Sequence, residues 1–264
     1  MKIALTIAGS DSGGGAGIQA DLKTFHQFGC FGTSAIVALT AQNTRGVTGV
    51  HVVPVDFIAL QLAALADDLP PAALKTGMLA TTEIVETVAD AVHRFGWRPL
   101  VVDPVMIATS GDRLLRPDAE AAIRARLLPR AALVTPNLDE ASLLTGREVR
   151  SVAQMEDAGR ALLQAGAGAA LVKGGHGRGD EVTDVLVMHD GIQHYQHPRL
   201  ATTSTHGTGC TLSAAVTAGL ALGHPLEHAV RDALDYTWRA IERAPGLGTG
   251  HGPLNHTVAV HLED

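Results

Sequence analysis

The sequence predicts an α/β fold in three layers, with a central, mostly parallel sheet and helices on both of its faces. Short apolar runs rich in β-branched residues alternate with helical patterns along the 264 residues, as expected for a parallel sheet that is buried on both sides. Polar residues gather directly after several of these runs. With 46% hydrophobic residues and no long linker or repeat, the chain is expected to form one domain over residues 1–264.

Strands are expected where apolar segments are short and rich in β-branched residues. These segments are residues 3–8, 33–40, 74–76, 100–103, 133–135 and 169–173. Two further strands, 182–188 and 192–197, flank Asp190-Gly191. That dipeptide favours a tight turn, so the pair is predicted to form a hairpin.

Helices are expected where apolar residues recur every three or four positions. These segments are residues 17–28, 57–67, 81–95, 152–165, 208–222 and 225–243. Gly29 is placed to end the first of them, and Asn137 in the segment TPNLDE is placed to cap one more. The glycine- and proline-bearing segment 246–253 fits either an ordered loop or a loose end.

Polar residues cluster at the carboxyl ends of the expected strands. They are Gly9-Ser10-Asp11, Gln42-Asn43, Thr76-Gly77, Asp103, Asn137 and Lys173-Gly174-Gly175. Open α/β sheets bind ligands at this edge. The pattern therefore predicts a binding or catalytic site, since a purely structural protein has no reason to gather polar residues there.

The charge and cysteine content exclude several classes of function. The chain carries 20 basic and 27 acidic residues for a net charge of −7, with no basic cluster, which argues against binding to nucleic acids or anionic membranes. Its two cysteines, Cys30 and Cys210, do not make a disulfide scaffold. No apolar run reaches the length of a membrane span, so the cytoplasm is the expected location.

The segment Thr205-His206-Gly207-Thr208-Gly209-Cys210 precedes a helix of small residues and predicts an anion hole. Gly207 and Gly209 let backbone N–H groups converge, and the helix N-terminus adds partial positive charge. Cys210 lies in the first turn, where the pKa of a thiol is expected to be lowered. It could accept a proton from an attacking hydroxyl or orient that hydroxyl. A plain glycine cap is the alternative.

His206 and Cys210 also allow a second hypothesis, a Cys–His hydrolase. The two residues are only four positions apart. Catalytic Cys and His usually come from separate elements of a fold, so the spacing argues against this class.

The glycine-rich segment after the first strand allows a third enzyme class. Gly15-x-Gly17-x-x-Ala20 matches a variant of the dinucleotide fingerprint of Rossmann dehydrogenases. That fingerprint also needs an acidic residue at the end of the second strand, where this chain has Gln42-Asn43. A glycine bend that gives close access to a substrate fits better. The chain has no Walker A sequence, which excludes a P-loop kinase.

Three further positions suit a phosphate-handling site. Lys173, one of four lysines, ends a buried strand before two glycines, where its charge could neutralise phosphates, although a lysine snorkelling from a strand end is the alternative. Asn137 and Glu140 match a capping box, and they could equally orient Mg²⁺ and its waters. Asp103, which closes the strand VVD, is a similar candidate for the metal.

Taken in order along the chain, several segments resemble one family. They are AGSDSGGGAGIQADLKT, ALTAQNTRGV, KTGML, DPVM, SGDRLL, RLLP, TPNLDE, VKGGH and HGTGC. The sequence resembles the hydroxymethylpyrimidine/phosphomethylpyrimidine kinases of thiamine biosynthesis, within the ribokinase-like superfamily, from Ile3 to about His256. Ser12 stands where the family usually has proline. The resemblance implies a ribokinase-like fold, use of ATP and Mg²⁺, a homodimer, and phosphorylation of 4-amino-5-hydroxymethyl-2-methylpyrimidine and then of its monophosphate.

The resemblance also implies roles for individual residues. It places Gln42, Met78, Val105, Gly9 and Asp21 at the pyrimidine, with the Gln42 amide reading the aminopyrimidine edge. It makes Gly207, Thr208, Gly209 and Cys210 the catalytic anion hole, with Cys210 where many sugar-kinase relatives have Asp. It assigns Lys173, Asn137 and Thr205 to ATP, and Asp103 and Glu140 to the metal.

Two alternatives stay open beside the pyrimidine kinase. The cysteine-bearing branch of pyridoxal kinases resembles this sequence around the anion hole, although Gln42 and Met78 favour the pyrimidine. A ligand-binding protein without catalysis could keep the pocket alone. The presence of Lys173, Glu140 and Cys210 argues against that class.

Overall fold

The computed structural model describes residues 1–106, 117–175 and 179–260 of the chain. Within these ranges the strands form one nine-stranded sheet with the order β3-β2-β1-β4-β5-β6-β7-β8-β9. The segment SGDRLL and His176, the last residue of VKGGH, lie outside the described residues. None of the helices in the described part of the chain is both long and apolar enough to cross a bilayer.

Nine strands make up the sheet. They are β1 (Ile3–Gly9), β2 (Phe31–Asn43), β3 (Gly46–Val52), β4 (Ala73–Thr76), β5 (Leu100–Val102), β6 (Leu133–Val134), β7 (Ala169–Val172), β8 (Glu181–Met188) and β9 (Ile192–Pro198). The neighbours from β2 through β1, β4, β5 and β6 to β7 are parallel. The additions at the two edges, β3 at one end and β8 and β9 at the other, are antiparallel.

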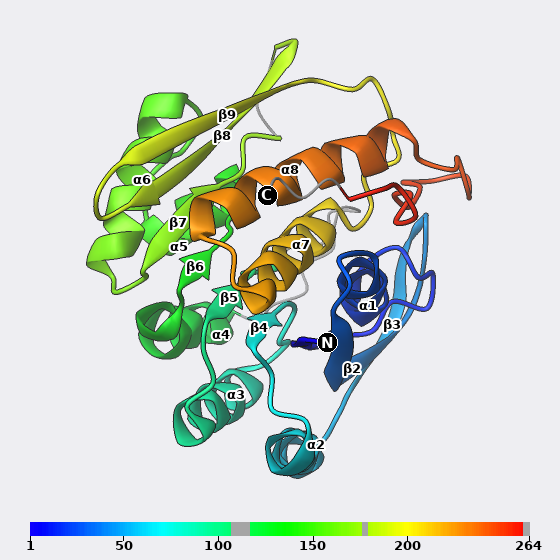
Figure 1. Ribbon diagram of the computed structural model, residues 1–264, viewed down its shortest axis with the longest axis vertical. Helices are drawn as coiled ribbons and strands as arrows, with labels where there is room; N and C mark the ends of the chain where they lie inside the picture. Colours follow the sequence, from blue (N-terminus) through cyan, green and yellow to red (C-terminus); the bar gives the residue numbers. More distant parts are fainter. Residues whose placement is uncertain (107–116, 176–178, 261–264) are drawn as a thin grey trace.

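Helices cover both faces of this sheet (Figure 1). They are α1 (Gly17–Gln27), α2 (Val55–Asp68), α3 (Thr82–Phe95), α4 (Pro117–Ala122), α5 (Leu138–Thr145), α6 (Val152–Gln164), α7 (Thr208–Leu222) and α8 (Leu226–Glu242). In Figure 1, α7 and α8 lie on one side of the sheet and α2 and α3 on the other. The predicted three-layer α/β architecture with a mostly parallel sheet is confirmed.

Local sequence signals set several helix ends. The Thr81 side chain accepts a hydrogen bond from the backbone of Ile84 at the start of α3, and Gly96 ends that helix in the left-handed conformation. Asn137 and Glu140 form the capping box that TPNLDE predicts, with both reciprocal contacts at 2.9 Å. Such caps satisfy backbone groups that the first and last turns leave unpaired.

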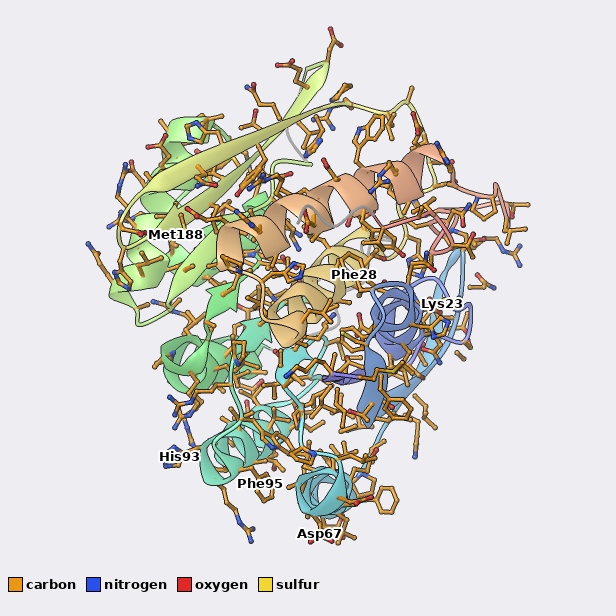
Figure 2. The ribbon with its side chains drawn as sticks, in the orientation of Figure 1. Lys23, Phe28, Asp67, His93, Phe95 and Met188 are labelled. Atoms are coloured by element: carbon orange, nitrogen blue, oxygen red, sulfur yellow. The ribbon has the colours of Figure 1, made fainter. Side chains whose placement is uncertain are left out.

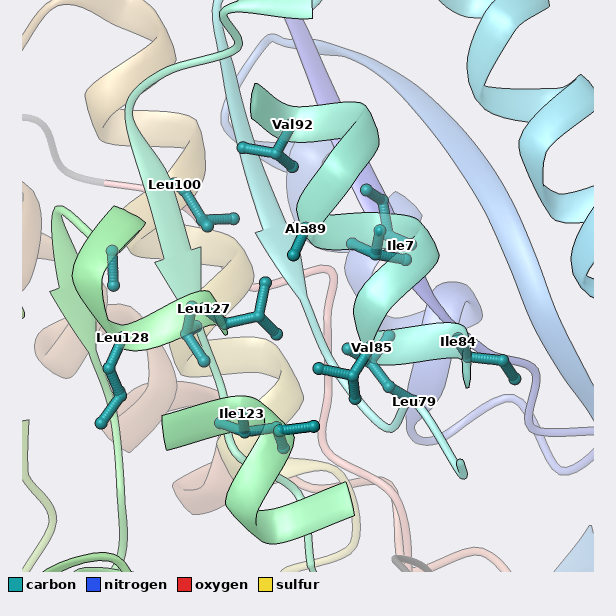
Figure 3. Packing of buried hydrophobic residues seen from close by; sticks show 14 of the residues in the cluster. Ile7, Leu79, Ile84, Val85, Ala89, Val92, Leu100, Ile123, Leu127 and Leu128 are labelled. Atoms are coloured by element: carbon teal, nitrogen blue, oxygen red, sulfur yellow. The ribbon is translucent and has the colours of Figure 1, made fainter. Parts of the chain in front are cut away.

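Among the described residues, apolar side chains form two large cores and a smaller one, which joins α5 and α6 to β7 and β8. Figure 3 shows part of one large core, in which Ile84, Val85 and Val92 of α3 pack toward Ile7 and Leu100 of the sheet. The second large core joins α1, α7 and α8.

Aromatic residues are few in the second core, so single ring contacts matter there. Phe28, labelled in Figure 2, meets the Tyr236 ring edge-on with their centroids 5.1 Å apart. At the periphery of the same view, Asp67 and His93 mark the outer ends of α2 and α3. The cores are thus built mainly from aliphatic side chains.

Two parts of the fold differ from the sequence prediction. Strand β3 was not predicted, because its sequence GVTGVHV contains two glycines and most of its residues are exposed at the sheet edge. The short helix α4 and the π and 3₁₀ turns of Ile123–Leu127 and Leu128–Arg130 were also missed. Each is too short to present a clear helical period.

The segment 246–253 is an ordered loop rather than a loose end. His251 donates its backbone N–H to the Thr44 carbonyl at 2.7 Å, which ties the segment to the turn between β2 and β3. The backbone N–H of His206 reaches the Gly252 carbonyl at 3.1 Å. The segment therefore lies directly behind the loop that begins α7.

A matched pair of leucines on α5 tests this arrangement. Leu144 is 2% exposed in the core, whereas its neighbour Leu143 is 45% exposed. We expect Leu144→Ala to lower the free energy of unfolding by about 2–5 kcal/mol through lost burial and a cavity. Leu143→Ala should change it by less than about 0.5 kcal/mol. Chemical denaturation measures both values, and equal losses would contradict the orientation of α5.

Candidate active site

A cavity of about 530 Å³ lies along the carboxyl ends of the strands and under the start of α7. This is the edge at which the sequence predicts ligand binding. All but one of the predicted site residues line it. They are Gly9, Gln42, Met78, Asp103, Val105, Asn137, Glu140, Lys173, Thr205, Gly207, Thr208, Gly209 and Cys210.

Asp21 is the exception, since it lies outside the cavity lining that its expected contact with the substrate requires. Its side chain is fully buried, forms an ion pair with Lys75 at 2.8 Å, and accepts a hydrogen bond from the Thr6 hydroxyl at 2.6 Å. It does not line the cavity. The reason is geometric: Asp21 lies on the buried side of α1, whereas the loop before the helix faces the cavity.

The loop before α7 is shaped by close backbone approach. Gly207 adopts the left-handed conformation, with φ of +85°, and a Cβ at this position would overlap the Gly15 carbonyl. A Cβ on Gly209 would lie 3.2 Å from the Lys173 Nζ. The amides at the start of α7 thus face the cavity beside a cation, an arrangement that suits a phosphoryl group.

Lys173 is held by two carboxylates. Its Nζ lies 3.2 Å from Asp103 and 4.0 Å from Glu140. Burial opposes the charge, but the two carboxylates raise the pKa of Lys173 above its ordinary value. Burial also raises the pKa of Glu140 to about 7, against the opposing effect of Lys173. The lysine therefore carries its charge into the site, while burial favours the protonated form of Glu140 more than in water.

Asp103 has several partners of its own. Its carboxylate accepts hydrogen bonds from Thr135 at 3.0 Å and Ser213 at 3.2 Å, besides its contact with Lys173. Although burial would raise its pKa, Lys173 and Lys75 lead the effects that hold the pKa of Asp103 below its ordinary value. Asp103 is thus an ionised anchor for Lys173.

The carboxylates do not form a closed metal cage. No group of three or more His, Cys, Asp or Glu side chains in the described ranges is arranged to hold a metal ion. Mg²⁺ commonly binds one or two carboxylates, several waters and substrate phosphates. Asp103 and Glu140, both on the cavity wall, fit that open kind of site.

Cys210 differs from the sequence prediction in its acidity. The position at a helix N-terminus predicts a lowered pKa, but burial raises the pKa of the thiol to about 12. Lys75 and a hydrogen bond from the Gly17 backbone oppose this effect, whereas the carboxylates of Asp21 and Asp103 add to it. The helix N-terminus is outweighed, and Cys210 is a neutral thiol at neutral pH.

Asp11 and His206 form a contact that the sequence did not reveal. His206 Nε2 lies 2.8 Å from an Asp11 carboxylate oxygen. Although burial would raise it, the pKa of Asp11 is lowered by hydrogen bonds from His206 and from the backbone of Ala16 and Gly13. His206 therefore links the glycine-rich loop to the start of α7.

The same contacts argue against two alternative enzyme classes. The amides of Gly13, Gly15 and Ala16 all donate to Asp11, so they are not free to bind the pyrophosphate of a dinucleotide. The His206 Nε2 faces Asp11, and Cys210 is a neutral thiol rather than half of a thiolate–imidazolium pair. Neither a Rossmann nucleotide site nor a Cys–His hydrolase fits this geometry.

The cavity has a narrow end near β1, β2 and β4. A Cβ on Gly9 would lie 2.6 Å from the Met78 Cε, so a larger residue there would have to displace the flexible end of that side chain. The Gln42 amide faces this end, with its Nε2 3.4 Å from His206 Nε2 and its Oε1 3.2 Å from the Thr40 hydroxyl. This end thus combines apolar side chains with several polar groups, among them the Gln42 amide, a lining that suits a small polar ring.

The opposite end of the cavity is bounded by β8, β9, α7 and α8. Its apolar wall includes Val182, Leu200, Leu212, Trp238 and Ile241. The Trp238 indole N–H donates to the Pro198 carbonyl at 2.9 Å, which joins α8 to the end of β9. Lys173 and the loop of residues 207–210 line the same cavity.

Three functional contacts escaped the sequence. They are the Asp11–His206 contact, the buried Lys75–Asp21 pair and the Ser213 contact with Asp103. A partial signal existed for Lys75, since a lysine inside an apolar strand must find a partner. No local pattern could identify that partner, because Asp21 and Lys75 are 54 positions apart.

Comparisons with known proteins agree with this geometry. The family model described as phosphomethylpyrimidine kinase matches residues 11–255. A hydroxymethylpyrimidine/phosphomethylpyrimidine kinase of Rhizobium meliloti is 53% identical over 257 residues, covering 96% of each chain.

Two solved structures are also similar. The phosphomethylpyrimidine kinase of Clostridium difficile has a TM-score of 0.82 at 42% identity, covering 91% of this chain and 100% of that one. An ADP complex of Bacillus subtilis pyridoxal kinase has a TM-score of 0.91 at 37% identity, covering 97% and 98%.

The raised pKa of Cys210 can be measured by alkylation with iodoacetamide. Only the thiolate reacts quickly, and burial raises the pKa to about 12. We therefore expect slow reaction at pH 7 and a rate that keeps rising up to at least pH 10. Mass spectrometry of the peptide that contains Cys210 separates it from Cys30. A plateau below pH 9 would show that the helix N-terminus prevails over burial.

Proposed function

The chain belongs to the phosphomethylpyrimidine kinase family, with a ribokinase-like fold, and from this premise we propose which reaction its site performs. It transfers the γ-phosphoryl group of ATP to the hydroxymethyl arm of 4-amino-5-hydroxymethyl-2-methylpyrimidine. It then phosphorylates the monophosphate to the diphosphate, in thiamine biosynthesis. The observation that carries the proposal is the loop of residues 207–210 against Lys173, in a cavity that has Gln42 and Met78 at its narrow end and Trp238 and Leu200 at its other, wide end.

The narrow end takes the pyrimidine. Gly9 leaves space for the ring, and Met78 and Val105 provide apolar contact along it. The Gln42 amide carries a donor and an acceptor, which suits a ring nitrogen beside an amino group. The hydroxymethyl arm then points toward Gly207–Cys210, where the phosphoryl group arrives.

The wide end takes ATP. Its apolar wall, which includes Trp238 and Leu200, suits the adenine ring. Asn137 and Thr205 lie on the wall nearer the anion hole, where they can meet the phosphate chain. Lys173 neutralises negative charge on the phosphates as transfer proceeds.

Catalysis here depends on position and charge rather than on a strong base. The backbone amides of Gly207 to Cys210 stabilise the charge on the phosphoryl oxygens in the transition state. Cys210, neutral at physiological pH, orients the acceptor oxygen by hydrogen bonding. Phosphoryl transfer has a loose transition state, so the acceptor needs little prior deprotonation.

Asp103 and Glu140 are the residues that would hold Mg²⁺, as an open pair completed by water and by ATP. Bound there, the cation would neutralise charge on the phosphates. The chain itself contributes the positive charge of Lys173, whose Nζ lies near both carboxylates. The expected homodimer and cytoplasmic location stay predictions.

Phosphorylation of pyridoxal is a second candidate activity. It is favoured by the TM-score of 0.91 with the B. subtilis pyridoxal kinase. Pyridoxal also carries a hydroxymethyl arm on a flat nitrogen ring. The Gln42 amide at the narrow end favours the aminopyrimidine, because it can both donate to a ring nitrogen and accept from an amino group.

A coupled ADP-release assay tests the proposed function. We expect turnover of the pyrimidine alcohol and of its monophosphate in the presence of Mg²⁺, and markedly slower turnover of pyridoxal. Product analysis by mass spectrometry should find the mono- and diphosphate. If only pyridoxal is turned over, the second candidate activity replaces the first. If none of the three compounds causes ADP release, both candidate activities are contradicted.

The role of Lys173 is testable by Lys173→Met, which keeps the length of the side chain and removes its charge. We expect kcat/KM for ATP to fall on the order of 100-fold, because a cation beside the anion hole is lost. The KM for the pyrimidine should stay within about threefold, since Lys173 does not bound the narrow end. Lys2→Met, at an exposed position, is the control. An unchanged kcat/KM for ATP would remove Lys173 from the phosphate site.

A further inference from the structure

A second lysine–carboxylate pair lies directly beneath the anion hole, outside the cavity. Lys75 in β4 and Asp21 in α1 have fully buried side chains, and Lys75 Nζ lies 2.8 Å from an Asp21 oxygen. The other Asp21 oxygen accepts from the Thr6 hydroxyl at 2.6 Å. Although burial opposes the charge, the carboxylates of Asp21 and Asp103 are among the groups that raise the pKa of Lys75, whereas burial raises the pKa of Asp21 against the opposing effect of Lys75. Lys75 is thus a buried ammonium that does not line the cavity.

This ammonium also contacts the start of α7. Lys75 Nζ lies 3.5 Å from the Cys210 carbonyl. The thiol of the same residue receives a hydrogen bond from the backbone of Gly17, at the start of α1. Strand β4 and the N-termini of two helices therefore meet at Cys210, with Lys75 at the junction.

Stability alone does not account for this pair. Removing two charges from water costs several kcal/mol per ion, and apolar replacements of buried ion pairs are often neutral or stabilising. The presence of a buried ion pair is therefore weak evidence that the pair serves to stabilise the fold. Its location beneath a phosphoryl-binding loop offers another role, because an ammonium in a dry interior acts strongly on nearby negative charge.

We infer that Lys75 and Asp21 form a positioning pair for the phosphoryl transfer. Asp21 holds the Lys75 ammonium beneath Cys210, and the ammonium fixes the Cys210 carbonyl and offsets the negative charge that enters the anion hole. Lys75 acts through the loop and touches neither substrate. The inference rests on the proposed kinase function and adds two residues to it.

The double variant Lys75→Met/Asp21→Leu separates positioning from folding. It replaces both charges with apolar side chains of similar size, so we expect a melting temperature close to that of the wild type. The kcat should fall by at least about 30-fold, as for the loss of one preorganised electrostatic contact. The KM values for ATP and acceptor should stay within about threefold. A folded double variant with near-normal kcat would overturn the inference.

The isosteric variant Asp21→Asn provides a second test that does not depend on how the double variant folds. It keeps an oxygen beside Lys75 but removes the charge that holds the ammonium in place. We expect kcat to fall at least about fivefold with unchanged KM values. An unchanged kcat in this variant would also overturn the inference.

Thr217→Val is the matched control for stability. Thr217 is buried in α7, and its hydroxyl donates to the Ser213 carbonyl at 2.7 Å, away from the pair. We expect a lower melting temperature with unchanged kcat. A comparable loss of kcat in this control would show that any weakening of α7 reduces turnover, and would overturn the inference.

Failure of the positioning pair can be distinguished from failure of the proposed function. All variants are compared with the wild type on whichever acceptor the wild type phosphorylates, pyrimidine or pyridoxal. A wild type that uses only pyridoxal would change the acceptor and leave the comparison intact. Active wild type with equally active variants would overturn the positioning pair alone.

Discussion

Charged side chains buried at the centre of this molecule must each contact a group of opposite charge, and the arrangement of the site depends on these pairs. Lys173 meets Asp103 at 3.2 Å, and Lys75 meets Asp21 at 2.8 Å, all at the carboxyl edge of the parallel strands. An unpaired ion there would cost several kcal/mol. The loop of residues 207–210 lies directly on these two lysines. The site that binds negative charge is thus set by the pairs beneath and beside it.

Close approach of backbone segments gives the site its shape. Gly207 meets the Gly15 carbonyl where no side chain would fit, and Asp11 binds both the glycine-rich loop and His206. The ordered segment 246–253 supports the same loop through the Gly252 carbonyl. Three stretches far apart in sequence therefore act as one wall.

The neutral thiol of Cys210 changes the expected chemistry at this wall. A helix N-terminus favours the thiolate, but burial and the carboxylates of Asp21 and Asp103 outweigh it. A neutral thiol can donate or accept a hydrogen bond without carrying charge into the site. In the proposed phosphoryl transfer, positioning by backbone amides and lysines would take the place of a strong base, which suits a loose transition state.

The sequence by itself determined the α/β class and the strand-end location of the cavity, because apolar periodicity and the placement of polar residues are local signals. Its resemblance to a kinase family supplied several more of the residues that line the cavity, among them Gln42, Met78 and Val105. The sequence also determined the capping box of Asn137 and Glu140. Only the tertiary structure decided that Asp21 lies outside the cavity, that Cys210 is neutral, and that Lys75 and His206 find their carboxylates. It also revealed the exposed strand β3. These facts depend on burial and on contacts between residues far apart in the chain, and no local pattern encodes either.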